Sequence, residues 1–113
     1  MRTLLAALAF LLGTVVCGTI AIVARLLRLE EGPGSIFDRV PRWWAGAILT
    51  AAGTRIVVHG AESLVPGEPH IFVSNHVSWF DVLVLVKVLP QYSFVAKAEL
   101  FRVPLFGAAA RAV

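Results

Sequence analysis

His76 and Asp81 stand five positions apart, directly after a short apolar run at residues 70–74. A neutral histidine can take a proton from an alcohol at physiological pH. A carboxylate beside it can fix the ring tautomer and stabilise the imidazolium that forms. The sequence offers no comparable pair elsewhere. These two side chains are therefore the candidates for general-base chemistry on a hydroxyl group.

The spacing limits how the two side chains can meet. Five residues of one α-helix turn a side chain by roughly 500°, so His76 and Asp81 would not share a face if both were helical. They can meet if His76 lies in a loop and Asp81 in the first turn of the next helix. Ser78 and Asp81 form an S-x-x-D pattern, which predicts a helix N-terminus with an acid at its third position. We expect this helix to run through residues 82–87 and to stop at Pro90.

A purely structural interpretation of these residues is also open. Asp81 can be only the capping acid, and His76 only a loop histidine that bonds to backbone; local spacing does not decide between the two. His59 and His70 stand at expected strand ends and are interpreted as structural. The single cysteine, Cys17, lies in an apolar segment. We therefore expect neither an internal disulfide nor a metal site.

The segment around this pair resembles the first signature, H-x4-D, of the glycerolipid acyltransferases, the family of the 1-acyl-sn-glycerol-3-phosphate (lysophosphatidic acid) acyltransferases. Two fixed positions alone are a weak signal, but further features follow in the family's order. These are the strand end at residues 73–76, the segment 94–100 one helix later, the segment 104–107, and Arg111. The resemblance covers roughly residues 55–113.

The resemblance implies transfer of a fatty acyl group from acyl-CoA or acyl carrier protein to the sn-2 hydroxyl of lysophosphatidic acid, which gives phosphatidic acid. His76 would be the general base, and Asp81 would orient it. Asn75 and Ser78 would shape the loop, and Lys97 would meet the substrate phosphate. No cofactor, metal or prosthetic group is implied. Two alternatives stay open: another lysolipid acceptor, such as lyso-ornithine lipid, and a non-catalytic, membrane-anchored remnant.

Composition points to a membrane. The chain has 113 residues, of which 58% are hydrophobic, and its mean hydropathy is +0.84. This is high for a soluble domain. The formal charge of +3 on an apolar protein favours anionic membrane lipid or phosphorylated substrates as partners. Nucleic acid is not expected, because the arginines are scattered and no basic stripe with interleaved aromatic residues occurs.

Residues 3–24 form an uncharged run that would span roughly 33 Å as a helix, enough for the bilayer core. We interpret it as a retained anchor, because it is long for a signal peptide and no A-x-A site ends it. The larger arginine group lies on its C-terminal side: Arg25, Arg28, Arg39 and Arg42. This favours a cytoplasmic C-terminal part, and the family resemblance implies a bacterial inner membrane with the catalytic part on that side.

A second apolar stretch opens at Pro41 and ends near Gly53, and it is too short to span a bilayer comfortably. It contains the pair Trp43 and Trp44. Tryptophans beside arginines suit the membrane interface, but ordinary packing against the first helix explains them equally well. Residues 1–54 are thus expected to form a membrane-associated pair of helices.

The pattern changes at residue 55. Strands are predicted at residues 55–59, 70–74 and 92–96, with a helix between the last two. Strand, helix and strand imply a right-handed parallel crossover in a sheet covered on both faces, and so an α/β fold. His76 and Lys97 would then lie at the carboxyl edge of the sheet, where such folds bind ligands. A solvated Lys97 is the alternative.

The expected organisation is an anchoring unit at residues 1–54 and the N-terminal part of an acyltransferase α/β domain at residues 55–113. Members of the family continue into later signatures, one with an arginine that helps to hold the substrate phosphate. These do not occur in this sequence. We therefore expect a fragment that is inactive alone, because a base without a positioned acceptor does not reach near-attack geometry.

Overall fold

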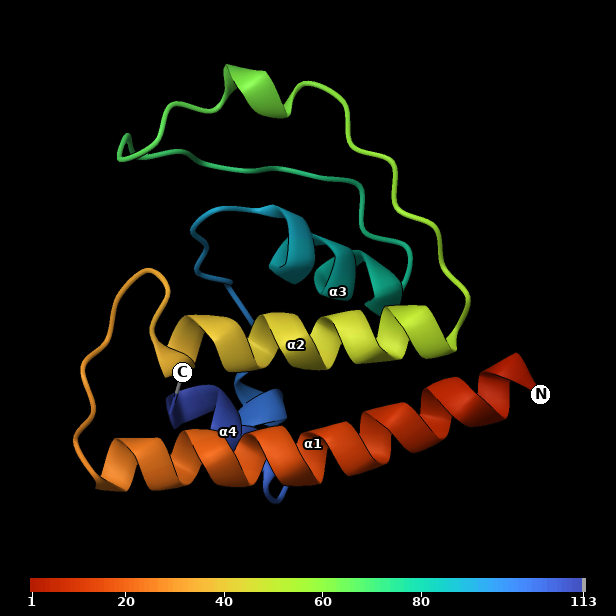
Figure 1. Ribbon diagram of the computed structural model, residues 1–113, viewed down its shortest axis with the longest axis vertical. Helices are drawn as coiled ribbons and strands as arrows, with labels where there is room; N and C mark the ends of the chain where they lie inside the picture. The colour runs from red at the N-terminus through yellow and green to blue at the C-terminus, as the bar shows by residue number, and fades with distance from the viewer. Residues whose placement is uncertain (113) are drawn as a thin grey trace.

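The computed structural model describes residues 1–112, which form four α-helices and two short 3₁₀ helices. The α-helices are α1 (Arg2–Leu26), α2 (Ile36–Ala51), α3 (Trp79–Val88) and α4 (Phe106–Ala112), and the 3₁₀ helices are η1 (Ala61–Ser63) and η2 (Ala98–Arg102). Helices α1 and α2 run antiparallel, α3 lies on the other side of α2, and α4 packs on α1 (Figure 1). The expected N-terminal pair of helices is confirmed.

Helix α1 is the one helix in residues 1–112 that is long and apolar enough to cross a membrane. Its 25 residues span about 37 Å at 1.5 Å each. The residues that it buries against the other helices are all small: Gly13, Cys17, Gly18, Ala21 and Ala24. Its large apolar side chains, such as Leu4, Leu8, Leu11, Val15 and Val23, stay exposed. Small residues inside and large apolar residues outside are typical of a helix that packs within lipid.

The two tryptophans of α2 have different surroundings. Trp44 lies over Gly13 of α1, where an added Cβ would come 2.9 Å from its Cδ1 atom. Its indole N–H donates to the hydroxyl of Thr14 at 3.2 Å. Trp43, in contrast, is 62% exposed. The packing explanation therefore holds for Trp44, whereas Trp43 has the exposure that an interfacial side chain needs.

Helix α2 begins at Ile36, five residues before Pro41, where the apolar stretch was expected to open. The extra turn has a local cause. Asp38 accepts a hydrogen bond from the backbone N–H of Gly34 through Oδ2 at 3.1 Å. An acid at this place satisfies a free N–H at the helix N-terminus and interacts favourably with the helix dipole.

The largest buried cluster joins α2 to α3. It consists of Ala45, Ile48 and Leu49 from α2 with Leu83 and Val86 from α3. Trp44, Ile56 and Tyr92 are partly buried around it. The apolar contacts therefore hold α3 against the face of α2 that looks away from α1.

The predicted strands at residues 55–59, 70–74 and 92–96 are absent, since residues 1–112 contain no β-strand. The first two belong to a long connection between α2 and α3, whose only regular element is η1 (Figure 1). No backbone hydrogen bond joins the three segments, and Ile71 and Val73 are 94% and 92% exposed. A strand is stable only where a neighbour pairs its N–H and C=O groups. The α/β class is therefore not confirmed by the described residues, which are helical.

The last segment is helical with an interruption, as expected from about residue 98 onward with a break near Pro104. Helix η2 ends at Arg102, and α4 begins at Phe106. Gly107 lies so close to η2 that an added Cβ would overlap the carbonyl group of Phe101. Arg111 donates to the same carbonyl oxygen at 2.9 Å. These contacts fold α4 back against η2.

Candidate functional site

The N-terminus of α3 carries the candidate catalytic pair, His76 and Asp81. Ser78 is the N-cap, and its hydroxyl accepts a hydrogen bond from the backbone N–H of Phe80 at 3.2 Å. Asp81, at the third helical position, accepts from the backbone N–H of Ser78 at 2.9 Å. The predicted capping box is therefore formed, and the helix begins at the predicted place.

The same carboxylate holds His76. Oδ2 of Asp81 lies 3.3 Å from Nδ1 of His76 and also accepts the N–H of Val77 at 2.8 Å. His76 is in the loop before α3 and Asp81 is in its first turn, the arrangement that the spacing requires. The capping role of Asp81 and its contact with His76 are thus not alternatives, because one oxygen atom makes both.

The electrostatics of the pair follow from these bonds. The backbone N–H groups of Ser78 and Val77, and then His76, hold the pKa of Asp81 below its ordinary value. Asp81 is therefore ionised at neutral pH and can only accept hydrogen bonds. Nδ1 of a neutral His76 must then carry the proton, which leaves the Nε2 lone pair available. The His76 side chain is 62% exposed, so a hydroxyl group can approach it from outside. The pair has the arrangement of a general base and its orienting acid.

The other predicted site residues are less constrained. Asn75 is exposed, and its side chain makes no hydrogen bond within the described part of the chain. Lys97 is exposed and directly precedes η2 rather than following a strand. No hydrogen bond or ion pair joins Lys97 to His76 or Asp81 in residues 1–112. The expected approach of His76 and Lys97 at a sheet edge does not occur, because residues 1–112 form no sheet.

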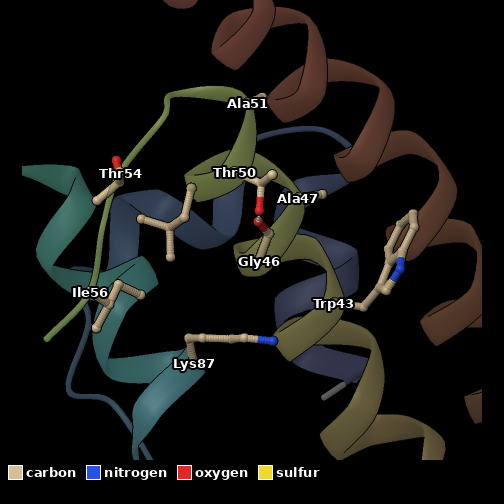
Figure 2. Close-up of a pocket in the computed structure, with 9 residues that line it drawn as sticks. Trp43, Gly46, Ala47, Thr50, Ala51, Thr54, Ile56 and Lys87 are labelled. Atoms are coloured by element: carbon tan, nitrogen blue, oxygen red, sulfur yellow. Dashed lines mark hydrogen bonds between the residues drawn. The ribbon is translucent and has the colours of Figure 1, made fainter. Parts of the chain in front are cut away.

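A groove of about 620 Å³ lies between α2 and α3 (Figure 2). It is lined by Trp43, Gly46, Ala47, Leu49, Thr50, Ala51, Thr54, Ile56 and Lys87. The Lys87 side chain extends across Gly46, where an added Cβ would come 3.3 Å from Nζ. None of the predicted site residues lines this groove. In residues 1–112, no three His, Cys, Asp or Glu side chains are grouped to bind a metal ion.

Sequence reasoning missed the role of Arg42, which joins α2 to the far end of α3. Its guanidinium group donates to Asp38 Oδ1 at 2.8 Å, to the carbonyl oxygen of Val86 at 3.1 Å and to that of Pro90 at 2.8 Å. It also lies 5.4 Å from the centre of the Tyr92 ring. The four-residue spacing of Asp38 and Arg42 signals their ion pair. Nothing local signals the contacts with α3, which are more than forty residues away in sequence.

Comparison with known proteins gives a consistent picture. The family profile described as "Acyltransferase" matches residues 55–113. A "lyso-ornithine lipid O-acyltransferase" from Pseudomonas aeruginosa is 34% identical over 101 residues, which cover 86% of this chain and 37% of that protein. A protein of the same name from Rhizobium meliloti is 40% identical over 72 residues, or 64% of this chain and 24% of the relative.

A "1-acyl-sn-glycerol-3-phosphate acyltransferase alpha" from Ovis aries is 43% identical over 49 residues, which cover 42% of this chain and 17% of that protein. The matched part of the chain thus spans 37%, 24% and 17% of the lengths of these three relatives. No solved structure matches it at a comparable level of significance.

Proposed function

The chain belongs to the acyltransferase family, and on this basis we propose that the whole protein transfers a fatty acyl group from a thioester to the free hydroxyl of a lysolipid. The observation that carries the proposal is the hydrogen bond between His76 Nδ1 and Asp81 Oδ2 at 3.3 Å. It leaves Nε2 of His76 able to accept the hydroxyl proton.

The proposed reaction is direct acyl transfer. As Nε2 of His76 takes the proton, the hydroxyl oxygen attacks the thioester carbonyl carbon, and a tetrahedral intermediate forms. The C–S bond then breaks, and the imidazolium returns its proton to the leaving thiolate, so that an ester and a free thiol result. The negative charge of Asp81 stabilises the imidazolium while the proton stays on His76. Asn75 and Ser78 would shape the loop that carries the base. The scheme uses no metal ion or prosthetic group, and acyl-CoA or acyl carrier protein enters as a substrate.

Two acceptors fit this chemistry. Lyso-ornithine lipid is the first candidate, because the relative of that name from Pseudomonas aeruginosa is 34% identical over 86% of this chain, whereas a "1-acyl-sn-glycerol-3-phosphate acyltransferase BAT2, chloroplastic" from Brassica napus is 30% identical over 81% of it. Lysophosphatidic acid, acylated at its sn-2 hydroxyl, is the second candidate. The resemblance of residues 55–113 to the glycerolipid acyltransferases implies this acceptor.

The test is an assay of the whole protein in vesicles with each acceptor and with acyl-CoA or acyl carrier protein as donor. Product formation on one or both lysolipids supports the proposal, and His76→Ala should lower the rate by about 10²–10⁴-fold. His70→Ala is the matched control, since His70 bonds only to the carbonyl oxygen of Val65 in an exposed loop. Equal rates for the parent protein and His76→Ala would reject the mechanism.

We further propose that α1 anchors the protein in a bacterial inner membrane, with residues 55–113 on the cytoplasmic side. The exposed large apolar side chains of α1 and the arginines that follow it support this. The protein should stay in the membrane pellet after alkaline carbonate extraction. Its release into the supernatant would contradict the anchor.

A further inference from the structure

Arg42 holds the end of α3 to the N-terminal pair of helices through directional polar contacts. Helix α3 ends at Val88, and Pro90 follows, which cannot continue the helix. The last carbonyl groups of a helix lack intrahelical donors. Arg42 donates to three carbonyl oxygens there, those of Val86, Lys87 and Pro90, from a different helix. A cation at a helix C-terminus is also favoured by the helix dipole.

The guanidinium group is itself held in place. Asp38 accepts its Nε–H at 2.8 Å, and the side chains of Arg42 and Asp38 are only 20% and 27% exposed. The Tyr92 ring lies against its other side. Because the guanidinium group is planar and its donors are fixed, contacts on three sides determine its position. The apolar cluster between α2 and α3 holds the two helices together by close packing, and Arg42 adds directional contacts at one end of α3.

The opposite end of α3 carries the reactive pair. The helix has ten residues, or about 15 Å, and its first turn contains Asp81, which holds His76. A shift or tilt of α3 relative to α2 therefore moves the imidazole ring. Since α2 packs on α1, the contacts of Arg42 determine where His76 lies relative to the helix pair proposed to contact the bilayer.

We propose that Arg42 is a positioning residue that sets the location of the His76–Asp81 pair relative to the membrane surface, so that His76 reaches the hydroxyl of a lysolipid held in the bilayer. This inference rests on the proposed function. A dissolved acceptor can approach the exposed His76 from many directions, whereas an acceptor held in the bilayer presents its hydroxyl at one depth. The contribution of Arg42 to kcat/KM should therefore be larger for an acceptor held in a bilayer than for a dissolved acceptor.

The experiment compares two acceptors in the whole protein: a long-chain lysolipid in vesicles and a short-chain, water-soluble analogue with the same headgroup. Arg42→Gln should lower kcat/KM for the vesicle acceptor on the order of 10- to 100-fold more than for the soluble one, the scale of a misplacement of about 1 Å. Arg42→Lys keeps the charge but cannot make the forked contacts, so it should give only partial rescue. Arg39→Gln is the matched control, because Arg39 is exposed on the same helix and, within residues 1–112, donates no hydrogen bond to α3.

A purely structural role would lower both activities by the same factor, through the fraction of folded protein, and this result would overturn the inference. Unchanged activity with both acceptors would overturn it as well. A second measurement does not need activity. A fluorophore on Val77→Cys in a Cys17→Ser background, quenched by lipids brominated at known depths, reports the distance of the α3 N-terminus from the bilayer. Arg42→Gln should change that depth.

The two measurements separate the two proposals. If the parent protein acylates neither acceptor, the proposed function fails, and the depth measurement still decides on Arg42. An unchanged depth in Arg42→Gln would overturn the inference.

Discussion

Oδ2 of Asp81 lies 3.3 Å from Nδ1 of His76, and the same atom accepts the backbone N–H groups of Val77 and Ser78. A single oxygen atom therefore caps the N-terminus of α3 and contacts His76, the candidate base. Substitutions around it can separate the two effects, because Ser78 contributes to the cap without contacting His76.

Ser78→Ala should destabilise the protein by about 1 kcal/mol, the usual cost of removing an N-cap hydroxyl, and should leave most acyl-transfer activity in the folded fraction. Asp81→Asn should remove most activity, because a neutral amide does not stabilise the imidazolium and can present its N–H₂ group to His76. Thermal unfolding and initial rates of the two variants, measured side by side, check this. Retained activity in Asp81→Asn would leave Asp81 as a capping residue only.

Lys97 is predicted to contact the acceptor phosphate. Lys97→Met should raise KM for lysophosphatidic acid and leave KM for lyso-ornithine lipid, which has no phosphate, unchanged. An exposed ion pair contributes about 0.2–1 kcal/mol, so the expected increase is up to about fivefold. Lys87→Met is the control, because Lys87 lines the groove between α2 and α3 and not the loop that carries His76. Equal changes for the two acceptors would rule out a phosphate contact.

Gly107→Ala should destabilise the protein by about 1–3 kcal/mol, the typical cost of inserting a methyl group where no space exists. The added Cβ would overlap the backbone carbonyl of Phe101, and a backbone atom cannot rotate away as a side chain can. Ala108→Ser adds one heavy atom at the next, exposed position and should change the free energy of unfolding by less than about 0.5 kcal/mol. Chemical denaturation in detergent micelles measures both. Similar stability of the two variants would contradict the close approach of α4 to η2.

The ion pair of Asp38 and Arg42 should make stability depend on acid pH. Partial burial raises the pKa of Asp38, but hydrogen bonds from Arg42 and the Gly34 N–H more than offset this, and the pKa lies below its ordinary value. The unfolded chain therefore binds the proton first as the pH falls. The contribution of Asp38 is complete above about pH 4 and is lost as the pH falls through the lower folded-state pKa.

Asp38→Asn should accordingly reduce the slope of the free energy of unfolding against pH below about pH 4. Thermal unfolding followed by circular dichroism across this range gives the slope. If the slope of the variant equals that of the parent protein, the ion pair of Asp38 and Arg42 does not contribute to the pH dependence of the free energy of unfolding.

The start and end of a helix can be predicted from the sequence where the residues that determine them are close neighbours in the chain. The S-x-x-D pattern at Ser78 places the start of α3, and Pro90 places its end. The same pattern occurs at Ser35 and Asp38, and it would have placed the start of α2 at Ile36 in preference to Pro41. No capping box forms there, however, because the Ser35 hydroxyl makes no cap bond and Asp38 accepts from the N–H of Gly34 instead of that of Ser35.

Non-local features could not be predicted in this way. β-branched residues at 55–59 and 70–74 favour extended backbone, but a strand also needs a partner, which single-segment patterns do not supply. Trp43 and Trp44 are adjacent and chemically identical, and the packing of α2 against α1 determines that Trp44 is the one covered, by Gly13 and Phe10. The contacts of Arg42 with α3 likewise depend on how two helices pack, which residue types alone do not specify.

The shared oxygen atom of Asp81 has a consequence for motion. The amide protons of Val77 and Ser78 exchange with solvent deuterium only when they leave Oδ2, and a molecule whose first turn of α3 has opened in this way has also released His76. Exchange at these two positions therefore measures, without any substrate, how often Asp81 leaves the cap from which it also contacts His76. Slow exchange would mean a base that is oriented before the acceptor arrives.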